Sequence, residues 1–191
     1  MDKYNKIERN LKNHSEFSIF YLILVSLILL PAFALIIEYL LNFSINLIIP
    51  EFSYFLMIAF LSPLIEEGGK ITAYEIYSKR GNFQNNILSI ALIGFLFGLT
   101  ENLLFYFGAG SDFTTAEIIH RVLNGEILHS IAPVFYITGK NSTRSKPLSF
   151  MLPVTVHAVW NLLIYFELNT IFIYLFSLLL IIYLIIKIKR T

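Results

Sequence analysis

The chain has 191 residues, of which 57% are hydrophobic, and a mean hydropathy of +0.71, which is above the range of soluble globular proteins. Its formal charge of +1 gives no electrostatic basis for binding nucleic acid or a strongly acidic partner. Cysteine is absent, which excludes disulfides, thiolate metal sites and a cysteine nucleophile, so histidine and carboxylate side chains must hold any metal.

Six apolar segments alternate with short polar connections along the chain. They cover residues 17–41, 52–77, 87–107, 118–138, 148–166 and 171–186. Each approaches or exceeds the ~20 residues that a helix needs to cross the hydrocarbon core of a bilayer. We therefore expect an all-α polytopic bundle of about six transmembrane helices at residues 17–186, with tails at residues 1–16 and 187–191. No internal repeat is visible.

The positions of the basic residues predict the orientation of the bundle. Of fourteen Lys and Arg residues, all but Lys70 and Arg121 lie in the tails or in connections that six crossings place on one side. Basic connections stay on the cytoplasmic side, so we expect both termini in the cytoplasm. A cleaved signal peptide remains an alternative for the first segment, because Ala32-Phe33-Ala34 has the form of a cleavage site. Against it, the segment stays apolar through Leu40.

Several polar side chains lie within the apolar segments, where an ionisable group is costly unless it is paired or hydrated. Such groups are functional candidates. They are Lys70 and Arg121, the acids Glu66, Glu67, Glu101 and Glu126, the histidines His129 and His157, and the amides Asn102, Asn124 and Asn161.

Helical spacing predicts which of these groups can meet. Glu66 and Lys70 are four residues apart and can pair, whereas Glu67 is rotated by about 100° from Glu66. One lysine cannot serve both acids equally, so one carboxylate is left for another task. Two structural alternatives remain. Glu66 and Lys70 could form only a buried ion pair that fixes helix register, and the histidines could form only hydrogen bonds between helices.

Three further spacings predict close helix contacts and a bend. Gly94 and Gly98 allow a neighbouring helix to approach closely. Four-residue steps put Arg121, Gly125 and His129 on one stripe, and His157 with Asn161 on another. Pro153 removes an amide donor near Ser149 and favours a local bend there.

The depth of each polar residue in the membrane, estimated at ~1.5 Å per residue along straight helices, predicts two layers of polar groups. The histidines, Lys70 and the acid pair fall near the midplane. Glu101 and Arg121 fall together nearer the outer surface, so we expect these two to pair.

Taken in order, these motifs resemble the PrsW-type intramembrane proteases, within the wider CAAX prenyl protease and bacteriocin-processing (CPBP) group. The resemblance covers roughly residues 60–163. It rests on Glu66-Glu67-Gly68-Gly69-Lys70, on Phe97-Gly98-Leu99-Thr100-Glu101-Asn102, on Arg121 with His129, and on His157-Ala158-Val159-Trp160-Asn161.

The resemblance implies an intramembrane endopeptidase that cleaves a membrane-anchored protein or peptide in the lipid bilayer of a prokaryotic plasma membrane. It implies that Glu66 activates water with His129, that Glu67 assists through charge and orientation, and that His157 and Asn161 polarise the peptide carbonyl. The expected structural or substrate-orienting residues are Lys70, Glu101, Asn102 and Arg121.

Two questions stay open from the sequence. His129, His157 and Glu67 are a ligand set suited to catalytic zinc, but a metal-independent glutamate mechanism explains the same residues. Functions of another class are a proton-coupled transporter, which the missing repeat disfavours, and a non-catalytic scaffold or immunity protein.

Overall fold

The structure is a computed structural model that describes residues 24–79, 86–109, 114–141, 145–166 and 170–189. Within these ranges the regular elements are all helices and no strand occurs, which confirms the predicted all-α class. The elements are η1 (Val25–Leu29), α2 (Leu30–Ile48), α3 (Pro50–Leu56), η2 (Met57–Leu61), α4 (Ser62–Ser78), α5 (Ile87–Ala109), α6 (Thr115–Ile131), α7 (Val134–Asn141), α8 (Lys146–Tyr165) and α9 (Thr170–Ile188), where η marks a π-helical turn.

The first predicted segment is longer than the sequence suggests. Its helix continues to Ile48, and the chain reverses at Ile49, which has φ −139° and ψ 68°. Pro50 then starts α3, where its missing amide hydrogen is not needed. Because the predicted end at Leu41 is too early, Glu38 lies in the interior of α2 and not near its end.

The fourth predicted segment is two helices. α6 ends at Ile131 and α7 begins at Val134. Pro133 lies between them and has no amide hydrogen with which to continue the hydrogen-bond ladder of α6. Membrane depths estimated along residues 118–138 as one straight helix are therefore wrong.

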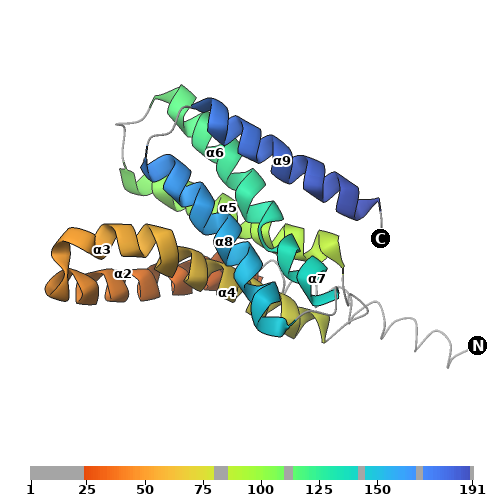
Figure 1. The fold of residues 1–191 in the computed structure, drawn as a ribbon. Helices are drawn as coiled ribbons and strands as arrows, with labels where there is room; N and C mark the ends of the chain where they lie inside the picture. Colours follow the sequence, from red (N-terminus) through yellow and green to blue (C-terminus); the bar gives the residue numbers. More distant parts are fainter. Residues whose placement is uncertain (1–23, 80–85, 110–113, 142–144, 167–169, 190–191) are drawn as a thin grey trace, which may run out of the picture.

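α2 and the α3–α4 segment form an antiparallel hairpin beside the remaining helices (Figure 1). The end of α4, all of α7, the start of α8 and the end of α9 lie toward the same end of the molecule. The described lysines at these positions are Lys79, Lys140, Lys146, Lys187 and Lys189. Their common location agrees with the predicted one-sided distribution of basic residues.

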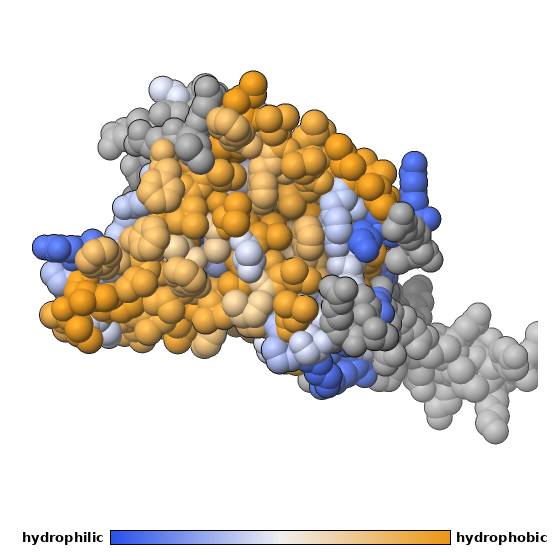
Figure 2. All heavy atoms as spheres, viewed as in Figure 1, coloured by the Kyte–Doolittle hydropathy of each residue, from blue (hydrophilic) through white to orange (hydrophobic). Residues whose placement is uncertain are grey.

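The surface of the protein is apolar and its interior holds charge. Apolar side chains cover most of the face in Figure 2, and the most hydrophilic residues gather toward its ends. Ile48 is 78% exposed and Phe107 76%, whereas Glu67 and Lys70 are both 0% exposed. A surface of this kind is stable in lipid and not in water. The protein is therefore an integral membrane protein.

Four helical stretches in the described ranges are long and apolar enough to cross a membrane. They are Val25–Ile48, Ile87–Leu104, Lys146–Tyr165 and Ile171–Ile188. The other two predicted spans, residues 52–77 and 118–138, contain most of the buried ionisable groups. Glu66, Glu67 and Lys70 interrupt the apolar sequence of the first of these spans, and the second contains α6, which has only 17 residues.

Candidate active site

α4 carries the acid pair and the lysine into the protein interior. Lys70 Nζ donates to Glu67 Oε1 at 2.7 Å and lies 3.8 Å from Glu66 Oε2. The same ammonium group lies 4.4 Å from the centre of the Phe97 ring, a cation–π contact. The expected preference of the lysine for one acid is confirmed, but the preferred acid is Glu67. Glu66 is the carboxylate left over, and its buried Oε2 has no hydrogen-bond partner among the described residues.

His157, on α8, is oriented by Glu67. Its Nδ1 lies 2.9 Å from Glu67 Oε1. An ionised carboxylate only accepts hydrogen bonds, so this contact requires the ring proton on Nδ1 and leaves a lone pair on Nε2. That Nε2 lies 3.9 Å from Glu66 Oε2.

His129, near the end of α6, is held from both sides of its ring. Lys70 Nζ lies 2.9 Å from Nδ1, and Glu101 Oε2 lies 3.0 Å from Nε2. Because an ammonium group only donates, Nδ1 must carry the lone pair, and Nε2 carries the proton that faces Glu101. Nδ1 lies 3.8 Å from Glu66 Oε2. Both histidines therefore present a lone pair close to the same partnerless oxygen.

The predicted glycine contact brings His129 to this position. A Cβ atom at Gly94 would lie 1.8 Å from the backbone oxygen of His129. At Gly98 it would lie 2.8 Å from Cβ and Cδ2 of the same histidine. α5 and α6 can approach this closely only because both residues lack a side chain.

Glu66, His129 and His157 form a group that fits a metal ion. One ligand atom from each lies within 4.8 Å of the others, and all three residues are buried. Tetrahedral zinc with bonds of ~2.0–2.1 Å places its ligand atoms ~3.3 Å apart. The 3.8 and 3.9 Å separations at Glu66 Oε2 are slightly wider than this, and the three side chains would hold a zinc ion after a small adjustment. The geometry favours Glu66 in the ligand set over Glu67, the acid that the sequence suggests.

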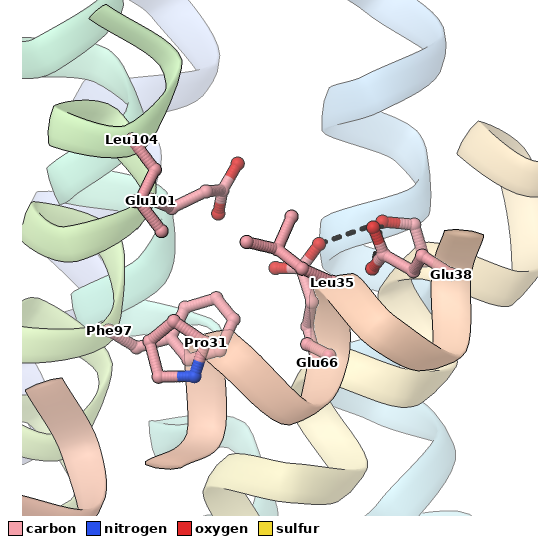
Figure 3. A pocket seen from close by; sticks show the side chains of 9 residues that line it. Pro31, Leu35, Glu38, Glu66, Phe97, Glu101 and Leu104 are labelled. Atoms are coloured by element: carbon pink, nitrogen blue, oxygen red, sulfur yellow. Dashed lines mark hydrogen bonds between the residues drawn. The ribbon is translucent and has the colours of Figure 1, made fainter. Parts of the chain in front are cut away.

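A pocket of about 80 Å³ lies between α2, α4 and α5, next to Glu66. Glu38 and Glu101 lie on opposite sides of it, with Glu66 between them (Figure 3). Ser62 Oγ lies 2.8 Å from Oε1 of both Glu38 and Glu66. Leu35 also lines the pocket and is exposed on the apolar surface, so the site adjoins lipid.

The sequence analysis did not assign chemistry to Glu38 or Ser62. Glu38 could have been identified as an acid inside an apolar helix. The predicted end of that helix at residue 41 placed Glu38 near the helix end instead.

The remaining candidates have other partners. Asn161 Nδ2 donates to the backbone oxygen of Ile58 at 3.0 Å, and Asn102 Nδ2 donates to Glu126 Oε1 at 3.2 Å. Gly125 adjoins Asn102, as its small size predicts. The contact of Glu101 with His129 places Glu101 beside the buried histidines and not in a separate layer, so the two-layer hypothesis is wrong for this residue. The side chain of Arg121 lies outside the described part of the structure, and its pairing stays a prediction.

Comparison with protein families agrees with this site. The sequence model of the family described as PrsW family intramembrane metalloprotease matches residues 15–187. The chain belongs to the PrsW family. It is therefore a membrane-embedded peptidase, and a hydrolase, in a family whose description includes a metal. Neither a curated protein nor a solved structure matches the chain. The buried Glu66, His129 and His157 group fits the catalytic site of a peptidase, and the family match favours a peptidase over the transporter alternative.

Proposed function

We propose that this PrsW-family protease cleaves a membrane-anchored protein at a zinc site formed by Glu66, His129 and His157. The observation that carries the proposal is Glu66 Oε2, a buried carboxylate oxygen without a hydrogen-bond partner. Two histidine lone pairs lie 3.8 and 3.9 Å from it. Bound zinc supplies Lewis-acid polarisation of water and of the peptide carbonyl.

The neighbouring side chains hold the three ligands in place. Glu67 fixes the ring of His157 through Nδ1, and Glu101 faces the protonated Nε2 of His129. Carboxylates behind metal-binding histidines set ring orientation and raise ligand basicity. Ser62 holds Glu66 by Oε1, so that Oε2 remains directed to the histidines.

The contact of Lys70 with His129 favours a second mechanism, without metal. Lys70 Nζ lies 2.9 Å from His129 Nδ1, the nitrogen that zinc requires, and must leave it when zinc binds. In the metal-independent mechanism Lys70 stays there, and Glu66 acts as the general base toward water. Glu66 and Glu67 share the ammonium group of Lys70, and Glu38 and Glu101 line the pocket beside Glu66. A divalent cation would offset part of the negative charge of these four acids.

We further propose that the protein resides in a prokaryotic plasma membrane with the basic helix ends and both termini in the cytoplasm. The common location of the described lysines supports this orientation. The ordered motifs support a relation to the wider CPBP group. The formal net charge of +1 gives no electrostatic basis for a nucleic-acid substrate.

Cleavage of a single-span reporter protein in proteoliposomes tests the proposed site. We expect chelation to abolish cleavage and zinc to restore it. Glu66→Gln, His129→Gln and His157→Gln should each lower the rate by at least about 10²-fold, because each removes a ligand or the base. The matched control is Glu126→Gln, a change to an interior acid outside the group, which should leave the rate unchanged.

Three outcomes separate the alternatives. Cleavage that survives in all three variants refutes the site. Cleavage that resists chelation but needs Glu66 refutes the zinc and favours the glutamate mechanism. Loss of cleavage on chelation, with recovery in zinc, supports the proposal as stated.

A further inference from the structure

α4 begins with a π-helical turn and a proline, a combination that leaves a backbone carbonyl without its helical donor. At the end of η2 the amide of Ser62 donates to the oxygen of Met57, five residues earlier. In the same register the next amide would donate to Ile58, but residue 63 is proline and has no amide hydrogen. An unpaired carbonyl is strongly unfavourable inside a membrane protein. The oxygen of Ile58 therefore needs a donor from elsewhere.

Asn161, on α8, supplies that donor. Its Nδ2 lies 3.0 Å from the oxygen of Ile58. Asn161 is one helical turn after His157, whose Nδ1 lies 2.9 Å from Glu67. α8 thus holds the α4 segment at two levels, once at the acid pair and once at the turn that leads into it.

We propose that Asn161 is a positioning residue, which fixes α4 against α8 through the Ile58 carbonyl and thereby sets the separation of Glu66 and His157. The inference rests on the proposed function, because it takes these two residues to bind zinc and act in cleavage. It differs from the role that the family resemblance implies for Asn161, which is polarisation of the substrate carbonyl. In this structure the amide of Asn161 donates to the backbone oxygen of Ile58, which Pro63 leaves without a backbone donor.

α2 offers a matched control, because it begins in the same way. In η1 the amide of Leu30 donates to Val25, and Pro31 follows without an amide hydrogen. Thr100 Oγ1 lies 2.9 Å from the oxygen of Leu27, which is adjacent to Ser26, the residue that corresponds to Ile58 in this register. α2 carries no member of the Glu66, His129 and His157 group. A side-chain hydrogen bond to a backbone carbonyl of this π-helical turn can therefore be removed there without direct effect on the metal ligands.

The test restores the missing backbone donor. Asn161→Ala should lower kcat by about 10²-fold, the effect of a misplacement near 1 Å, with little change in KM. It should also weaken zinc binding, measured by competition titration. Asn161→Ala combined with Pro63→Ala regains an amide hydrogen that reaches the Ile58 carbonyl, so most of the lost kcat and zinc affinity should return. Thr100→Val should lower the melting temperature and leave kcat unchanged.

Other results overturn the inference. If Asn161 instead polarises the substrate carbonyl, the double variant stays as inactive as Asn161→Ala, while both variants bind zinc normally. A double variant that fails to fold, or that folds without recovering kcat and zinc affinity, also refutes the positioning role. Glu66→Gln is measured alongside. Cleavage that survives Glu66→Gln refutes the proposed site itself, whereas loss in Glu66→Gln without rescue in the double variant refutes only the role of Asn161.

Discussion

Glu66 and Glu67 are adjacent in the sequence, yet their carboxylates have different surroundings. Glu67 Oε1 has two close partners, Lys70 at 2.7 Å and His157 at 2.9 Å. Glu66 is bonded through Oε1 to Ser62, and its Oε2 has no hydrogen-bond partner among the described residues. A carboxylate whose charge is already shared between a lysine and a histidine is a weaker metal ligand than one with a free oxygen. The two acids therefore have different proposed roles, ligand for Glu66 and support for Glu67.

This division predicts different zinc affinities for two conservative variants. Glu66→Gln removes the anionic ligand, so we expect no stoichiometric zinc after purification. Glu67→Gln keeps an acceptor oxygen but removes the negative charge behind His157 and beside Lys70, and outer partners of this kind contribute about 10- to 100-fold in affinity. Competition titration of the detergent-purified protein measures both. Equal zinc affinity in Glu67→Gln and the parent contradicts the supporting role, and normal binding by Glu66→Gln contradicts the ligand set.

At the residue scale, the sequence predicted most of the buried polar cluster but not the contacts within it. Ionisable groups in apolar segments identified Glu66, Glu67, Lys70, His129 and His157. Spacing placed Lys70 on the face of Glu66, but at three residues Glu67 is also within reach, and the side-chain rotamers decide between them. Rotamers depend on the neighbouring helices, which the sequence pattern does not describe.

At the element scale, the contact between α5 and α6 determines where His129 lies. Gly94 and Gly98 of α5 face the backbone and side chain of this histidine, at distances that no Cβ atom can occupy without movement. Small residues at a helix crossing are the usual means of close approach in membranes. The α5 glycines therefore belong to the architecture of the site.

Gly98→Ala should disable the enzyme without unfolding it. The new Cβ would lie 2.8 Å from Cβ and Cδ2 of His129. The histidine must move, at a cost of about 1–3 kcal/mol for overpacking and about 10²-fold in kcat for misplacement. Thermal unfolding in detergent and the reporter cleavage assay measure the two effects.

Gly68→Ala is the control, since its Cβ would meet Phe150 at an ordinary 3.6 Å although it adjoins Glu67. It should retain activity. Full activity in Gly98→Ala would show that this contact does not position the site.

The apolar segments were predictable in approximate range, but the positions of the breaks within them were not. The estimate of membrane depth separated Glu101 from His129 because it treated residues 118–138 as one straight helix. The chain instead bends between Ile131 and Val134, and the two residues are in contact. The π-helical turns before α2 and α4 also give no periodic signal, although Pro31 and Pro63 mark where each ends.

At the scale of the whole molecule, the lysine-bearing ends and the α2–α3 turn lie on opposite sides of the bundle (Figure 1). The turn region contains polar residues but no Lys or Arg between residues 42 and 51. This asymmetry is the property that sets the orientation of a membrane protein during insertion. It predicts that the turn faces outward and that the ends of α4 and α9 face the cytoplasm.

The absence of cysteine makes this orientation directly measurable, because each introduced cysteine is then the only thiol in the protein. Ser44→Cys reports on the α2–α3 turn, and Lys79→Cys and Lys189→Cys report on the ends of α4 and α9; all three positions are exposed. In intact cells a membrane-impermeant maleimide should label only Ser44→Cys, and permeabilisation should make the other two reactive. Labelling of Lys79→Cys in intact cells, with protection of Ser44→Cys, would invert the topology. Labelling of Lys79→Cys without that of Lys189→Cys would require a different number of crossings between these positions.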